Sequence, residues 1–140
     1  MVSIAILIIY MGIMFWISSL PGEKLTPERG IGITISQSIK HLGEYVILGI
    51  LVSMVLAQVT NKTLSIVFWS SVFSVCYGIL DEIHQAFVPT RYCTIDDMGI
   101  NAIGSVIGVL FYVYVHHKLK RKASLSHGQR DISTKSSARI

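Results

Sequence analysis

Four long apolar stretches, separated by short polar segments, dominate the pattern of the chain. They cover residues 2–20, 38–59, 63–87 and 96–117. About 20 helical residues cross a hydrocarbon core of about 30 Å, so each stretch is long enough to span a membrane. The pattern therefore predicts an all-α fold, a polytopic membrane protein built as a bundle of four transmembrane helices with short loops.

Helix-breaking residues mark the ends of two of these stretches. Pro21 and Gly22 follow the first stretch, and Pro89 follows the third. The first stretch has no basic residue before it and no small-residue cleavage site after it. We therefore expect a retained helix there, not a cleaved signal peptide.

Composition agrees with a membrane protein. Of the 140 residues, 51% are hydrophobic and 14% are charged, and the mean hydropathy is +0.59. A soluble domain of this size is far less apolar. Four spans use residues 1–117, which leaves no room for a separate soluble domain and only a tail at 118–140.

The net charge of +4 resides in that tail. Residues 118–140 hold seven of the 12 basic residues and one of the eight acidic residues. The tail is also rich in serine, so we expect it to be disordered. A basic cluster directly after a span is typical of the cytoplasmic side and attracts anionic headgroups. Because the cluster is short and lacks interleaved aromatic residues, nucleic acid is not an expected partner.

The positive-inside rule gives the orientation. Lys62 lies in the loop between the second and third stretches, on the same side of the membrane as the basic tail. Both termini are therefore predicted to be cytoplasmic, N-in and C-in, with the loops at 21–37 and 88–95 outside. The ionisable residues of the spans then fall at their extracytoplasmic ends.

These ionisable residues form the candidate site. Each costs roughly 2.5–3.5 kcal/mol at the bilayer centre on insertion scales, so a functional role is the default interpretation. At 100° per residue, Lys40, His41 and Glu44 share one face of the second helix. Polar positions also share faces of the third and fourth helices. The predicted site contains Lys40, His41, Glu44, Asp81, Glu82, His84, Gln85, Arg91, Asp97 and Asn101.

Single members of this group also have simpler explanations. Lys40 and Glu44 fit an i,i+4 pair worth a few tenths of a kcal/mol, and Asp97 fits a first-turn acid favoured by the helix dipole. Asp96 is assigned to the dipole or the N-cap, and Tyr45 to the core or the aromatic belt. A shared depth for residues from three helices and one loop nevertheless favours one common site.

A close-packing strip runs along the fourth helix. It contains Gly104 and Gly108, four residues apart, and small residues at this spacing let another helix approach closely. The strip serves packing within the bundle or, as an alternative, a homo-oligomer. Cys76 and Cys93 would lie at different depths, so no disulfide is expected.

Three motifs in the chain resemble the VanZ-like family of small bacterial membrane proteins. They are Lys40-His41-x-x-Glu44-Tyr45, Asp81-Glu82-x-His84-Gln85-x-Phe87-Val88-Pro89-x-Arg91 and Asp97-x-x-x-Asn101-x-x-Gly104. The resemblance covers about residues 10–115. Thr90 stands where members often have glycine. The resemblance implies a multi-pass protein of the bacterial plasma membrane and an association with tolerance of teicoplanin-type glycopeptides.

The first functional hypothesis is an enzyme acting on an envelope lipid or a lipid-linked cell-wall precursor. Glu44, Asp81 or Glu82 would act as base, and His41 or His84 as acid. The residues expected to bind the substrate are Lys40, Gln85, Arg91, Asp97 and Asn101. No cofactor can be named. A divalent ion on His41, Glu44, Asp81 and His84 would use the same side chains, but His-x-x-Glu is a weak motif and no metal site is predicted.

The second hypothesis is a binding protein without turnover. It would occupy or shield a lipid, a glycopeptide or a partner membrane protein at the outer leaflet, using the same charges. A transporter ranks last, because polar groups confined to one end of the bundle leave no polar path through its inner half.

Overall fold

The described residues of the chain fold into four helices, and each runs antiparallel to the next. The computed structural model describes residues 2–21, 30–91 and 93–137, and the side chains of all of these except 30–37 and 126–137. The elements are α1 (Val2–Ser18), α2 (Gly30–Val59), α3 (Thr63–Gln85) and α4 (Ile95–Ser137). The prediction of an all-α fold is confirmed, since the described residues form helices and no strand.

Three of the helices are long and apolar enough to cross a membrane. The apolar segments are Ser38–Val59, Thr63–Gln85 and Ile95–Leu125. The first helix is also apolar, but its 17 residues rise only about 25 Å at 1.5 Å per residue, at the lower limit for a span. The membrane character is thus confirmed, while the count of four spans stays a prediction.

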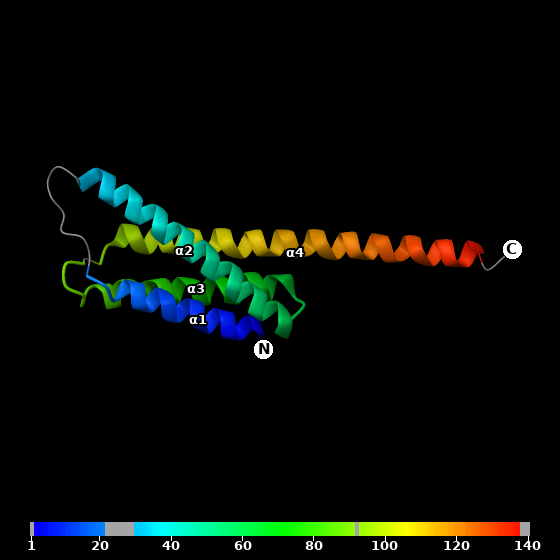
Figure 1. The fold of residues 1–140 in the computed structure, drawn as a ribbon, viewed down its shortest axis with the longest axis horizontal. Coiled ribbons are helices and arrows are strands. Elements are labelled where there is room, and N and C mark those ends of the chain that lie inside the picture. The colour runs from blue at the N-terminus through cyan, green and yellow to red at the C-terminus, as the bar shows by residue number, and fades with distance from the viewer. Residues whose placement is uncertain (1, 22–29, 92, 138–140) are drawn as a thin grey trace.

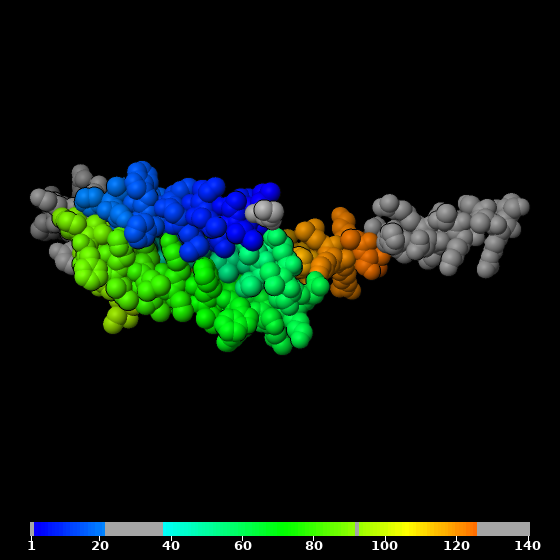
Figure 2. Space-filling view, turned by 90° about the horizontal axis from the view of Figure 1, so that it is seen from below, coloured from blue at the N-terminus to red at the C-terminus, as the bar shows by residue number. Residues whose placement is uncertain are grey.

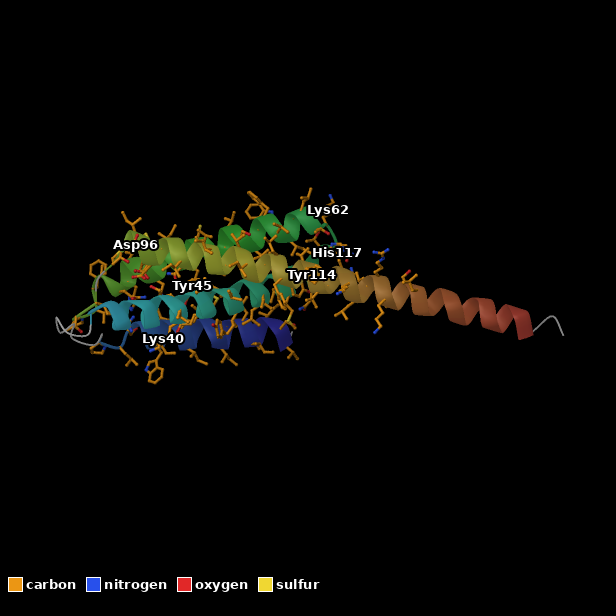
Figure 3. All side chains as sticks on the ribbon, turned by 90° about the horizontal axis from the view of Figure 1, so that it is seen from above. Lys40, Tyr45, Lys62, Asp96, Tyr114 and His117 are labelled. Carbon is orange, nitrogen blue, oxygen red and sulfur yellow. The ribbon has the colours of Figure 1, made fainter. Side chains whose placement is uncertain are left out.

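The two ends of the bundle hold different parts of the chain. The start of α1 and the end of α4 lie toward the same end (Figure 1), which also holds the turn between α2 and α3. Figure 3 shows Lys40 and Asp96 at the opposite end from Lys62 and His117. At its sides the bundle exposes apolar side chains, as a surface in lipid requires. Figure 2 shows α1 lying along one side of the bundle.

The observed helices differ in length from the predicted ones. α1 and α3 end at Ser18 and Gln85, about two residues early, while α2 begins at Gly30 and not at about 38. After α3 the backbone hydrogen bonds span three residues, as in a 3₁₀ turn: the amide of Phe87 donates to the His84 carbonyl, and the amide of Val88 donates to the Gln85 carbonyl. Pro89 disfavours helical geometry in the residue before it, so the helix cannot continue. Of the predicted external loops, residues 22–29 and 92 lie outside the described residues.

The fourth helix extends well beyond its predicted end at 117. It continues to Ser137 through the segment that the sequence predicts to be a disordered tail, and it projects away from the bundle (Figure 1). Lys, Arg, Leu and Ala are good helix formers, and no proline interrupts them. Side chains from Lys118 to Leu125 are exposed, so this part of the helix gains little from tertiary packing. The last three residues of the predicted tail, 138–140, lie outside the described residues.

The closest helix contact is the crossing of α2 and α4. A Cβ atom added to Gly108 would collide with the Val46 carbonyl oxygen, and one on Gly49 with that of Ser105. One on Gly104 would lie 2.7 Å from the Leu42 carbonyl oxygen. The glycine strip of α4 is therefore occupied by α2 of the same chain and is not free to pack on a second copy.

Substituting Gly108 tests this crossing. We expect Gly108→Ala to lower the melting temperature of the detergent-solubilised protein, because the backbones must separate, at a cost of about 1–3 kcal/mol. Gly99→Ala is the matched control, since a Cβ there meets nothing within 4 Å and alanine is the better helix former. Equal melting temperatures for the two variants would contradict the close crossing.

Candidate functional site

Four polar side chains are buried together where α3 and α4 meet α2. Asp81, Glu82 and Gln85 come from the last turns of α3, and Asn101 from the second turn of α4. Their exposed fractions are 8%, 0%, 4% and 1%, respectively. In hydrocarbon such groups are stable only with internal partners, so their contacts define what the site can do.

Asp81 is held through one carboxylate oxygen. The hydroxyl of Tyr45 donates to Oδ2 at 3.2 Å, and Gln85 Nε2 donates to the same oxygen at 2.9 Å. The other oxygen, Oδ1, is buried and has no hydrogen-bond partner. Asp81 is thus fixed in orientation while it keeps one acceptor atom unused.

Tyr45 lies in the core, one of the two places that the sequence interpretation gave it, and it also contributes to the polar cluster. It is fully buried, but its hydroxyl belongs to the polar cluster. Gly78 makes room for it: a Cβ there would lie 3.0 Å from the Tyr45 ring and 3.1 Å from Asn101 Cβ. The helical register of the sequence indicates that Tyr45 lies near the polar residues of α2, because it follows Glu44 directly and lies one turn after His41.

Arg91 ties α1 to the cluster. Its Nη1 donates to Gln85 Oε1 at 3.0 Å, its Nε to the Leu20 carbonyl at 2.9 Å and its Nη2 to the Ile17 carbonyl at 3.1 Å. A cation at a helix C-terminus also interacts favourably with the helix dipole. Three of the five guanidinium donors are therefore used within the protein, and Arg91 acts as a positioning residue for Gln85.

The turn before Arg91 uses a strained residue. Thr90 has a φ of 66°, in the left-handed region where glycine is at ease and other residues cost roughly 1–2 kcal/mol. This backbone conformation explains why a glycine suits this position. Val88 is buried and holds the turn in place. Arg91 therefore reaches the end of α1 from a loop of fixed position.

Glu82 and Asn101 form a second contact within the cluster. Asn101 Nδ2 donates to Glu82 Oε1 at 3.4 Å. Glu82 Oε2 and Asn101 Oδ1 are both buried, and neither has a hydrogen-bond partner. Two adjacent acids of α3 thus face different helices: Asp81 contacts Tyr45 of α2, whereas Glu82 contacts Asn101 of α4.

The polar face of α2 borders this cluster. Glu44 and His41 are partly buried, and the Glu44 carboxylate interacts electrostatically with His41, Asp81 and Arg91, as well as with the exposed Lys40. His41 Nδ1 is buried and has no hydrogen-bond partner. Lys40 lies at the edge, where its amine can reach the headgroup level.

His84 contacts α1 through Ser19. Ser19 Oγ and His84 Nε2 are 3.0 Å apart, and the rings of His84 and Phe15 have centroids 4.5 Å apart. Ser19 Oγ also donates its only hydrogen to the Phe15 carbonyl at 2.7 Å. His84 Nε2 must therefore be the donor to Ser19. This polarity is opposite to that of a base activating a serine nucleophile.

Thr94 and Asp97 are hydrogen-bonded to each other at the start of α4. Thr94 Oγ1 donates to Asp97 Oδ2 at 2.6 Å, and the Asp97 amide donates back to Thr94 Oγ1 at 3.1 Å. Thr94 is thus the N-cap residue, whose hydroxyl oxygen accepts from the amide three residues on, while the Asp97 carboxylate accepts from the Thr94 hydroxyl and not from its backbone amide. Asp96 and Asp97 both lie in the first turn of α4, where the sequence predicts acids favoured by the helix dipole. Of the two alternatives for Asp96, the N-cap belongs to Thr94.

No metal centre is assembled in the part of the chain that the structure describes. No three His, Cys, Asp or Glu side chains there are placed to hold an ion together. The set of His41, Glu44, Asp81 and His84 is divided: His84 contacts Ser19, the residue after α1, whereas Asp81 contacts Tyr45 and Gln85.

Comparison with known proteins identifies one family. The model of the VanZ/LLP1 family matches residues 3–116, which include all four helices up to the point where α4 leaves the bundle. No curated protein matches the chain, and no solved structure does.

The contacts of Arg91 predict the effect of a conservative change. Arg91→Lys should lower the free energy of unfolding by about 1–2 kcal/mol, because one amine cannot reach three acceptors in three directions. Thermal melting in detergent measures this loss. Lys40→Gln, at an exposed cation of the same end, is the control and should melt as the wild type does. An Arg91→Lys protein of unchanged stability would show that the three contacts contribute nothing.

Proposed function

Since the chain belongs to the VanZ/LLP1 family, we propose that this membrane protein binds the headgroup of an envelope lipid or a lipid-linked cell-wall precursor. The site of binding is the polar cluster of α2, α3 and α4, at the extracytoplasmic face of the bacterial plasma membrane. The observation that carries this proposal is Asp81, which is oriented by Tyr45 and Gln85 yet keeps Oδ1 unpaired in a buried position.

An unpaired buried acceptor is costly. Leaving a polar group without a partner costs roughly 1–3 kcal/mol, and more when the group is charged. His41 Nδ1 adds a second unpaired atom to the same end of the bundle. A ligand that offers hydrogen-bond donors, such as the hydroxyl or amine groups of a headgroup, removes these costs when it binds. The site therefore suits recognition of a polar headgroup.

Binding is favoured over catalysis by two contacts. The hydroxyl of Ser19 donates to the Phe15 carbonyl and so is not activated by His84. Arg91 uses three donors within the protein, whereas a phosphoryl-transfer site needs such donors for the reacting group. Glu44 and Asp81 then orient a ligand, and no reaction is required of them.

Binding at the outer leaflet accounts for glycopeptide tolerance of the teicoplanin type. A glycopeptide must reach a cell-wall precursor that is attached to a lipid in this leaflet. A membrane protein that holds the headgroup of the precursor shields it, and an added affinity of 1.4 kcal/mol already shifts that competition tenfold. The shielding needs no turnover.

Asp81→Asn tests the role of the unpaired carboxylate. In cells that depend on this protein for teicoplanin tolerance, we expect the variant to lower the minimum inhibitory concentration to that of cells lacking the protein. The amount of protein in the membrane, measured by immunoblot, should be unchanged. Asp96→Asn removes an exposed acid at the same end and should leave tolerance intact. Full tolerance in the Asp81 variant would refute the proposed site.

The proposed orientation is tested through Cys93. Cys93 is exposed in the turn before α4, and Cys76 is exposed on the membrane-spanning part of α3. In a Cys76→Ser protein, we expect a membrane-impermeant maleimide to label Cys93 in intact cells. Labelling of a cysteine introduced at Lys62 should require lysis. The reverse pattern would place the polar cluster at the cytoplasmic face.

A further inference from the structure

The contact between Glu82 and Asn101 leaves an imbalance of donors and acceptors. A carboxylate has only acceptors, and a carboxamide has one acceptor oxygen and two N–H donors. One contact, from Asn101 Nδ2 to Glu82 Oε1, is made at 3.4 Å. The remaining oxygens, Glu82 Oε2 and Asn101 Oδ1, are both acceptors and both lack a partner. Without a proton between them, neither oxygen can satisfy the other.

One added proton gives both oxygens a hydrogen-bond partner. We propose that Glu82 carries a proton on Oε2 and donates it to Asn101 Oδ1, so that the two side chains form a carboxylic acid–carboxamide pair with two hydrogen bonds. The pair is a proton-binding site inside the bundle. It is separate from Asp81, whose Oδ2 is already satisfied by Tyr45 and Gln85, and it does not depend on which ligand the cluster binds.

Charged and polar groups from three helices surround Glu82. The groups that act on it are His41 from α2, Asp81 from α3, and Asp97 with the Thr94 backbone amide at the start of α4. Asp81 and Asp97 are acids, whereas His41 and the Thr94 amide can stabilise an ionised carboxyl group. The cations at this end, Lys40 and Arg91, act on Glu44, and Arg91 is bonded to Gln85. Glu82 is 0% exposed and its Oε2 has no hydrogen-bond partner, and burying an ionised carboxyl group that lacks such partners is costly.

Glu82→Gln distinguishes a neutral from an ionised side chain. Glutamine has the same shape and carries an amide hydrogen where the proposal places the acid proton, so it can still donate to Asn101 Oδ1. We expect the purified full-length variant to melt no lower than the wild type at neutral pH. Asn101→Leu, which removes the partner, should melt lower. A Glu82→Gln protein that melts lower than the wild type, or does not fold, would overturn the proposal.

Infrared spectroscopy reads the proton directly. The spectrum of the wild type at neutral pH should contain the carbonyl stretch of a protonated carboxylic acid, shifted by deuteration, and this band should be missing from Glu82→Gln. Asp96→Asn, at an exposed acid, is the control and should remove only carboxylate bands. If Glu82→Gln likewise removes only carboxylate bands, Glu82 is ionised and the proposed pair does not exist.

Discussion

The backbone contact between α2 and α4 is the constraint on which the rest of the structure depends. Gly49, Gly104 and Gly108 leave no side chain between the two helices, so the backbones touch. Lipid gives little hydrophobic force for bringing helices together, and close van der Waals packing of this kind is its main replacement. The crossing places Tyr45 of α2 and Asn101 of α4 at one level, where the last turns of α3 reach both.

The polar cluster is held by a chain of contacts that reaches α1, α2 and α3. Arg91 binds the carbonyls that end α1, and it also fixes Gln85, which in turn fixes Asp81. Tyr45 completes the hold on Asp81 from α2. The amide of Gln85, which the sequence analysis expects to bind the substrate, is thus the link between a loop cation and a buried acid. Rigidity of this kind leaves Asp81 Oδ1 in one defined position, which a binding site requires.

The sequence was sufficient for the order of the described helices and for the burial of several polar residues between them, because both follow from hydropathy and from a period of 3.6 residues. It also placed Asp81, Gln85 and Asn101 toward the interior. The roles of Arg91 and Ser19 could not be predicted, because their acceptors are backbone carbonyls, which have no sequence signature. The core was one of two alternatives for Tyr45, since a buried tyrosine and an interfacial one look alike in an apolar run, and its hydroxyl contact with Asp81 was not predicted. The length of α4 was missed because a polar, serine-rich composition outweighed the absence of proline.

Asp81 and Glu82 are neighbours in the sequence, yet their surroundings give them different tasks. A step of 100° around α3 turns one toward the Tyr45 hydroxyl of α2 and the other toward the Asn101 carboxamide of α4. Two ionised carboxylates this close in hydrocarbon would repel each other strongly, so protonation of one stabilises the charge of the other. Asp81 accepts two hydrogen bonds on one oxygen and keeps the other unpaired, whereas Glu82 faces a carboxamide that can both donate and accept a hydrogen bond. The adjacent acids therefore serve separately, Asp81 in the proposed binding of a ligand and Glu82 in the proposed pair with Asn101.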